Sequence, residues 1–129
     1  MSTNRRLRRN RKETLHLARR ISAKTSEGST YETFGTPSEF IGEQWPATGR
    51  AQAQMYGEKL PYIRNVKIEG NYSIVVSDEQ ETVQYVFENG LTVCENDGMY
   101  LDAPTNGEPD YRVLSVKPYK PLRLEVMKR

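Results

Sequence analysis

The chain has 129 residues, of which 36% are apolar and 28% charged, and its mean hydropathy is −0.79. This length and composition predict one domain with a small core, and the absence of any run of about 18 apolar residues argues against a membrane-spanning helix. We also expect no secretory signal, since no apolar segment follows the charged start. The single cysteine, Cys94, excludes an internal disulfide, and Cys94 with the single histidine, His16, cannot supply a four-ligand zinc site.

The charge is distributed unevenly along the chain. Residues 1–24 carry a net charge of +8 and residues 25–129 a net charge of −6. We therefore expect a basic N-terminal arm over 1–24 and a separate globular domain over 25–129. The run RRLRRNRK, residues 5–12, is too poor in apolar residues to fold alone, so it is either a docking arm for phosphate or an acidic protein surface, or a solubilising tail.

The first half of the chain predicts two strands and a helix. In residues 13–22, ETLHLARRIS, apolar and polar side chains alternate well enough to favour a strand, with a short helix as the alternative. The composition of residues 22–30 predicts a loop. Residues 38–45 alternate as a strand, in which Gly42 marks a bulge or a close approach and Trp45 a core or interface anchor.

The segment 46–60, PATGRAQAQMYGEKL, is rich in small and amide side chains. We expect a short helix over residues 49–56, with Thr48 as its N-cap and Gly57 ending it in a left-handed conformation.

The second half predicts only strands, separated by turns rich in Gly, Asn, Asp and Pro. Their expected ranges are 63–68, 71–77, 81–88, 91–94, 99–101, 111–116 and 121–127, with 66–87 forming a meander. Leu122, Leu124 and Val126 fall on one face of the last strand. About seven short strands at regular spacing indicate an all-β fold, either a small antiparallel β-barrel or a sandwich; we favour the barrel, with a short helix or loop insertion and an extended basic arm.

No pattern in the chain predicts catalysis. There is no Gly-rich phosphate loop, no HExxH, and no Ser or Cys next to a His, so we expect no enzyme, no cofactor and no metal. Two non-enzymatic functions remain: an OB-like nucleic-acid-binding module and a subunit of a larger assembly. The first is disfavoured because the strand aromatics lie among as many acidic as basic residues.

Three segments resemble the head-closure, or stopper, proteins of the head-tail connectors of tailed bacteriophages and prophages. Residues 35–62, GTPSEFIGEQWPATGRAQAQMYGEKLPY, are similar to a recurrent order in that family: a strand, a phrase close to SPATGxAQxxxFG, and a tyrosine-containing strand. Residues 88–102, ENGLTVCENDGMYLD, resemble its acidic turn, and 110–128 its closing hairpin. Residues 71–87 are longer than usual there and look like an added hairpin.

The resemblance implies a small β-barrel that acts as a structural subunit of the phage neck. Such subunits form a ring of six or twelve copies below the portal or adaptor, seal the filled capsid and dock the tail. The implied partners are further copies of the chain, the portal or adaptor, tail-terminator or tail-tube proteins, and the packaged DNA end, without a membrane. The implied location is the virion neck, after assembly in the host cytoplasm. The neighbouring adaptor is an alternative, but adaptors are usually helical.

The resemblance also suggests which residues make contacts. In this family the segment that matches 46–60 projects towards the central channel, so we expect channel-facing positions at Arg50, Gln52, Gln54 and Lys59. The alternative is an ordinary surface helix packed on its own barrel. For the arm we expect docking onto the acidic face of a neighbouring ring, with DNA as the second choice, through Arg5, Arg6, Arg8, Arg9, Arg11 and Lys12.

Overall fold

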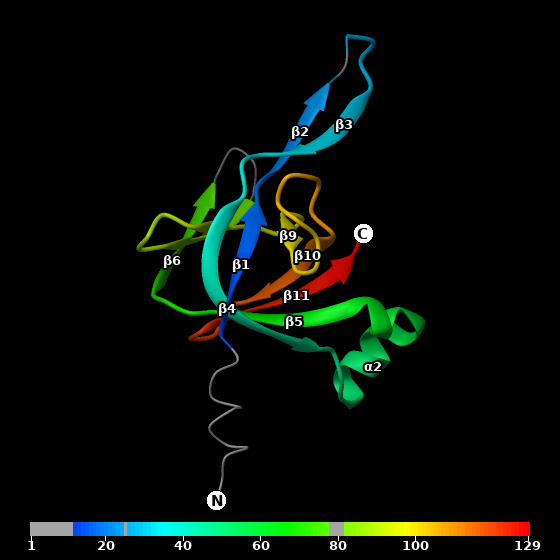
Figure 1. Ribbon diagram of the computed structural model, residues 1–129, viewed down its shortest axis with the longest axis vertical. Coiled ribbons are helices and arrows are strands. Elements are labelled where there is room, and N and C mark those ends of the chain that lie inside the picture. The colour runs from blue at the N-terminus through cyan, green and yellow to red at the C-terminus, as the bar shows by residue number, and fades with distance from the viewer. Residues whose placement is uncertain (1–11, 25, 78–81) are drawn as a thin grey trace, which may run out of the picture.

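The computed structural model describes residues 12–24, 26–77 and 82–129, and most of them lie in strands (Figure 1). The first half contains β1 (Glu13–Ala18), β2 (Arg20–Lys24), β3 (Thr30–Phe34), β4 (Ser38–Pro46), the helix α2 (Arg50–Tyr56), the 3-10 helix η1 (Gly57–Tyr62) and β5 (Ile63–Ile68). The second half contains β6 (Tyr72–Ser77), β7 (Thr82–Phe87), β8 (Thr92–Val93), β9 (Gly98–Tyr100), β10 (Tyr111–Lys117) and β11 (Leu122–Lys128). No helix among the described residues is long and apolar enough to cross a membrane.

Six of the strands close into a barrel in the order β1-β4-β5-β11-β10-β9. Every neighbouring pair is antiparallel, and β1 closes the barrel by pairing with both β4 and the short β9. Closure removes the unpaired edges that an open sheet of this size would expose. The predicted all-β fold, a small antiparallel barrel, is therefore confirmed, and the sandwich is not.

The barrel interior is filled by one cluster of aliphatic and aromatic side chains. As predicted, Leu122, Leu124 and Val126 of β11 share the inner face, and each is at most 1% exposed. Strand pairing places Leu122 opposite Ile68 and Leu124 opposite Val66 of β5. The register of β10 shifts between Val113 and Ser115, so the strict alternation of that strand breaks at this point.

Gly42 of β4 is a point of close approach. A Cβ atom built there would lie 2.5 Å from the carbonyl oxygen of Lys67 and 3.0 Å from the ring of Phe40. The pairing of β4 with β1 and β5 shows no register shift at Gly42. Of the two roles predicted for this glycine, close packing is therefore confirmed and the bulge is not.

Two further sheets extend from the barrel. The hairpin β2–β3 projects beyond one end of it, and β6, β7 and β8 form a three-stranded sheet (Figure 1). Phe87, Leu91 and Val93 anchor this second sheet in the same core as the barrel strands. The predicted meander over 66–87 is wrong in its first step, because β5 pairs with β4 and β11, and β6 pairs only with β7 among the described strands.

The boundary predicted between residues 24 and 25 is also corrected. Residues 13–18 form β1, a strand of the barrel itself, and β2 covers 20–24. Leu15 and Leu17 are buried in the core, which confirms the strand and excludes the short helix considered for 13–22. The barrel thus begins at Glu13, and the expected loop over 22–30 is shorter than predicted because strands enter it from both sides. Residues 1–11 lie outside the described residues.

Candidate functional site

The helix α2 and the 3-10 helix η1 form the connection between β4 and β5. The backbone N–H of Ala53 donates to Gly49 O at 3.0 Å, and Gly49 is the N-cap, so the expected cap at Thr48 is wrong. Instead, the backbone N–H of Thr48 donates to the side-chain oxygen of Gln52 at 3.2 Å. Gly57 ends the helix as predicted, with φ 54°, but its ψ of −122° lies outside the left-handed helical region.

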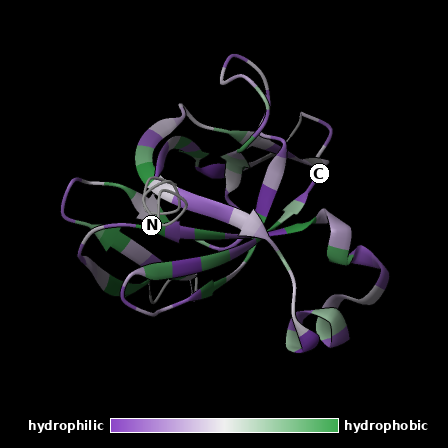
Figure 2. Cartoon of the chain, turned by 60° about the horizontal axis from the view of Figure 1, so that its bottom comes forward, coloured by the Kyte–Doolittle hydropathy of each residue, from purple (hydrophilic) through white to green (hydrophobic). Residues whose placement is uncertain are grey.

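The helix α2 contacts the barrel through polar side chains. None of its seven residues is buried. In Figure 2 the segment, seen as the coil at the lower right, mixes purple with pale green and lacks an intense green stripe. A helix normally docks through an apolar face, so the attachment of α2 must come from other contacts.

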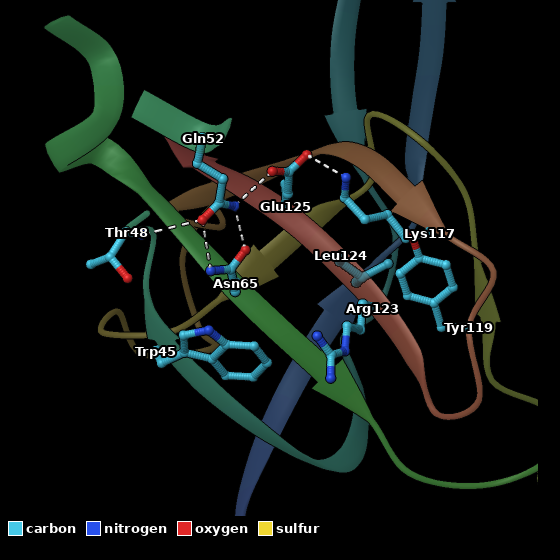
Figure 3. A pocket seen from close by; sticks show the side chains of 9 residues that line it. All are labelled: Trp45, Thr48, Gln52, Asn65, Lys117, Tyr119, Arg123, Leu124 and Glu125. Atoms are coloured by element: carbon cyan, nitrogen blue, oxygen red, sulfur yellow. Dashed lines mark hydrogen bonds and ion pairs between the residues drawn. The ribbon is translucent and has the colours of Figure 1, made fainter. Parts of the chain in front are cut away.

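Those contacts converge on Glu125 of β11. Gln52 Nε2 donates to Glu125 Oε2 at 2.7 Å (Figure 3). The Tyr56 hydroxyl donates to Oε1 at 2.9 Å. Ser115 Oγ also donates to Oε1, at 2.8 Å, and Lys117 Nζ lies 3.6 Å from the same oxygen. Gln52 Nε2 further contacts Asn65 Oδ1 at 2.7 Å. We call Gln52, Tyr56, Ser115, Lys117 and Glu125, with Asn65, the Glu125 cluster.

The position of Glu125 in the strand does not predict its burial. It alternates with inward-facing Leu124 and Val126 and therefore points to the outside of the barrel, yet it is only 2% exposed. Gln52 and Tyr56 of α2 lie over it. Sequence reasoning missed this residue, because the strand pattern assigns it to the solvent face.

The cluster favours an ionised Glu125. Burial by itself raises the pKa of the Glu125 carboxyl, but the hydrogen bonds from Gln52, Ser115 and Tyr56 and the charge of Lys117 outweigh it, so the pKa is lowered. Tyr56 shows the reciprocal effect: burial and the neighbouring Glu125 raise the pKa of its hydroxyl to about 12. The hydroxyl therefore remains a donor to a carboxylate at neutral pH.

A surface hollow of about 340 Å³ adjoins the cluster. Trp45 and Tyr119 supply aromatic rings, and Lys117 and Arg123 supply positive charge (Figure 3). The Arg123 guanidinium lies 5.9 Å from the centroid of the Trp45 ring, which is partly exposed rather than part of the core. The hollow therefore brings aromatic and cationic groups together on the surface.

The four residues expected to face a channel divide into two groups. Arg50, Gln54 and Lys59 are exposed, on α2 and η1, where they are accessible to a partner. Gln52 is half-buried and uses both ends of its amide within the chain, on Thr48, Asn65 and Glu125. Gln52 therefore positions the segment on the barrel.

Most of the predicted docking run lies outside the described residues, namely Arg5, Arg6, Arg8, Arg9 and Arg11. Lys12 is described: its Nζ lies 3.8 Å from the carboxylate of Glu69, on an exposed part of the surface. Such a pair contributes little to stability.

Asp97 is a second buried carboxylate, and nothing in the local sequence indicates its burial. Its two oxygens accept hydrogen bonds from the backbone N–H groups of Arg20, at 3.1 Å, and Cys94, at 2.9 Å. Asp97 thus fixes the start of the β2–β3 hairpin to the barrel. Within the described ranges, no three His, Cys, Asp or Glu side chains gather in a way that could hold a metal ion.

Comparisons of the chain with protein-family models, with curated proteins and with solved structures find no match.

Proposed function

We propose that this chain is a structural subunit of a phage neck, a head-closure or stopper ring that binds below the portal or adaptor, seals the DNA-filled capsid and docks the tail. The resemblance of residues 35–62, 88–102 and 110–128 to the stopper family supports this function, and the small barrel is the fold that the resemblance implied.

The observation that carries the proposal is the attachment of α2. The segment that resembles the channel-facing segment of stoppers is held on the barrel by Gln52 and Tyr56, which bind Glu125. Its other polar side chains, among them Arg50 and Lys59, are left exposed. Because the segment uses few of its side chains to bind its own barrel, the others remain available to contact a partner.

Repeated around a ring, Arg50 and Lys59 would form a positive collar. Such a collar attracts the phosphates of a DNA end, and the attraction weakens as salt rises. The small side chains between them allow close approach of neighbouring copies around an axis.

The basic run 5–12 docks, in this proposal, onto the acidic face of a neighbouring ring. Individual exposed ion pairs contribute only about 0–1 kcal/mol, so its strength comes from many pairs and from the avidity of a ring. Deleting residues 1–12 should therefore weaken docking and reduce its dependence on salt. Docking that is unchanged by the deletion would refute this role of the arm.

Electron microscopy of the protein mixed with its portal complex tests the proposal as a whole. We expect a ring of density below the portal, with the tip of α2 towards the axis. A ring in which Arg50 and Lys59 point outward would remove the collar, and absence of the protein from the neck would remove the proposed function.

A nucleic-acid-binding module is the second candidate, and the surface hollow is the observation that favours it. Trp45 and Tyr119 could stack on bases, and Lys117 and Arg123 could bind phosphate. The test is binding of single-stranded DNA at moderate salt by a chain that lacks residues 1–12. Binding that is lost in Trp45→Ala and Arg123→Ala would favour this candidate, and we expect no such binding.

A further inference from the structure

The hairpin formed by β6 and β7 carries apolar side chains out of the core and into solvent. Directly paired residues share one face of a sheet, and here the pairs are Tyr72 with Phe87, Ile74 with Tyr85, and Val76 with Val83. Phe87 is 4% exposed, whereas Ile74 and Val76 are 53% and 60% exposed. An apolar row therefore begins in the core and continues along the hairpin past the point where the chain covers it.

The other face of β6 is also apolar at its centre. Val75 pairs with Gln84 of β7 and is 46% exposed. The strand thus presents aliphatic side chains to solvent on both faces. Exposed apolar residues gathered in this way mark an interaction surface more often than scattered ones do.

The outer edge of β6 is unpaired within the part of the chain that the structure describes, since the sheet order is β6-β7-β8. Proteins usually protect such an edge with a charge, a proline, a bulge or a short strand. The strand β6, YSIVVS, has six residues without a charge, Pro or Gly, and pairs with β7 without a register shift. Its edge has none of these protections.

The base of this strand is fixed to the barrel. The Tyr72 hydroxyl donates to the carbonyl oxygen of Tyr119 at 2.7 Å, and the Tyr72 ring packs on Phe87 with centroids 5.5 Å apart. The edge is therefore held in an extended conformation, which lowers the entropic cost of adding another strand.

We propose that the edge of β6 binds the same edge of a second copy of this chain, in antiparallel register about a two-fold axis at Val75. The sequence from 73 to 77, SIVVS, is a palindrome in residue character. Antiparallel self-pairing places Ser73 opposite Ser77, Ile74 opposite Val76, and Val75 opposite Val75. Every apolar residue then meets an apolar residue, and no charge on β6 opposes the contact.

This pairing joins two three-stranded sheets into one continuous sheet of both copies. A two-fold contact pairs equivalent surfaces, whereas a closed ring of more than two copies requires a head-to-tail contact. The β6 contact is therefore distinct from the contacts of the proposed neck ring, and its test does not depend on them.

The test is the oligomeric state of the full-length protein, measured by light scattering after size exclusion, in Val75→Lys, in Val75→Asp and in their mixture. In the proposed dimer each variant places two like charges opposite one another at the axis, so we expect dimerisation to weaken about tenfold or more in each. Mixing the two variants pairs Lys with Asp and should restore the dimer. Ile41→Lys on β4, where Ile41 is 49% exposed but both strand edges are paired, is the matched control and should leave the dimer intact.

A second variant protects the test against a folding defect at Val75. In the proposed register, Ile74→Lys with Val76→Asp in one chain places the introduced lysine of each copy opposite the introduced aspartate of the other. This double variant should therefore dimerise, while Ile74→Lys alone should not. A wild-type protein that is monomeric at the highest concentration reached would overturn the proposal. Dimerisation unaffected by either Val75 variant would overturn it too, and so would a folded double variant that stays monomeric.

Discussion

Gln52 and Glu125 are 73 positions apart in the chain, and their side chains meet at 2.7 Å. This hydrogen bond joins the connecting segment between β4 and β5 to the last strand of the barrel. Since α2 buries no residue of its own, the bond and its neighbour from Tyr56 decide where the segment lies.

Glu125→Gln should destabilise the protein and loosen α2. The substitution removes the negative charge that the four donors of the Glu125 cluster, Gln52, Tyr56, Ser115 and Lys117, contact. It also places an amide N–H₂ group, itself a donor, among these donors. Hydrogen bonds to charged groups contribute about 1.5–3 kcal/mol, and we expect a loss of unfolding free energy of that order. Chemical denaturation measures it. Glu58→Gln makes the same change at an exposed position of η1 and should alter stability by less than about 0.5 kcal/mol. Equal losses of unfolding free energy in the two variants would show that the Glu125 cluster does not stabilise the fold.

The contribution of Glu125 should vanish in acid. Folding lowers the pKa of this carboxyl, so its charged form adds stability above the unfolded pKa of about 4.3, and that stability is lost as the pH falls through the folded pKa. The difference in unfolding free energy between wild type and Glu125→Gln should therefore be constant near neutral pH and shrink below about pH 4. A difference that persists unchanged at pH 3 would contradict the lowered pKa.

The contribution of Asp97 to stability should change with pH in the opposite direction to that of Glu125. Burial raises the pKa of this carboxyl, against the opposing effect of its backbone hydrogen bonds and of Arg19 and Arg20. Its protonated form is favoured on folding, so its effect opposes that of Glu125 in the acid range. The effect of Asp97 cancels in the difference between wild type and Glu125→Gln, because both proteins contain Asp97.

Gly42→Ala should strain the barrel where β4 passes β5. The new methyl group would meet a backbone carbonyl 2.5 Å away, which can yield only if the strands shift. Overpacking of this kind costs about 1–3 kcal/mol. Thermal unfolding provides the measurement. The control is Gly107→Ala, since a Cβ atom there meets no atom within 4 Å. A Gly42→Ala protein as stable as the control would refute the close approach.

Cys94 should react slowly with thiol reagents while the protein is folded. Burial, with a smaller effect of Asp97, raises the pKa of its thiol from 9.0 to about 11. Because the thiolate is the reactive form, the rate at pH 8 should fall about 100-fold or more below that of an ordinary cysteine. Labelling in denaturant, where the thiol has its usual pKa, is the internal control. Equal rates with and without denaturant would contradict the burial.

The strands themselves follow from local sequence. Alternation in 38–45 and 121–127 predicts strands that the structure confirms within one or two residues, because an apolar side chain on every second residue needs one buried face. The error at residues 66–87 arose at the level of pairing. Strands that are neighbours in sequence often pair, which would join β5 to β6, but β5 pairs with β4 and β11 instead.

The amino-acid sequence alone determined the all-β class, the sites of the turns and the inner face of β11. Each of these depends on a period of two residues or on turn chemistry that acts over a few positions. Only the tertiary structure decided that β1 closes the barrel, that β6 keeps an open edge among the described strands and that Glu125 is buried. These features depend on contacts between distant segments, and burial of Glu125 requires Gln52 and Tyr56 to arrive from another part of the chain. No local pattern specifies which strand edge, or which outer face, a distant segment will cover.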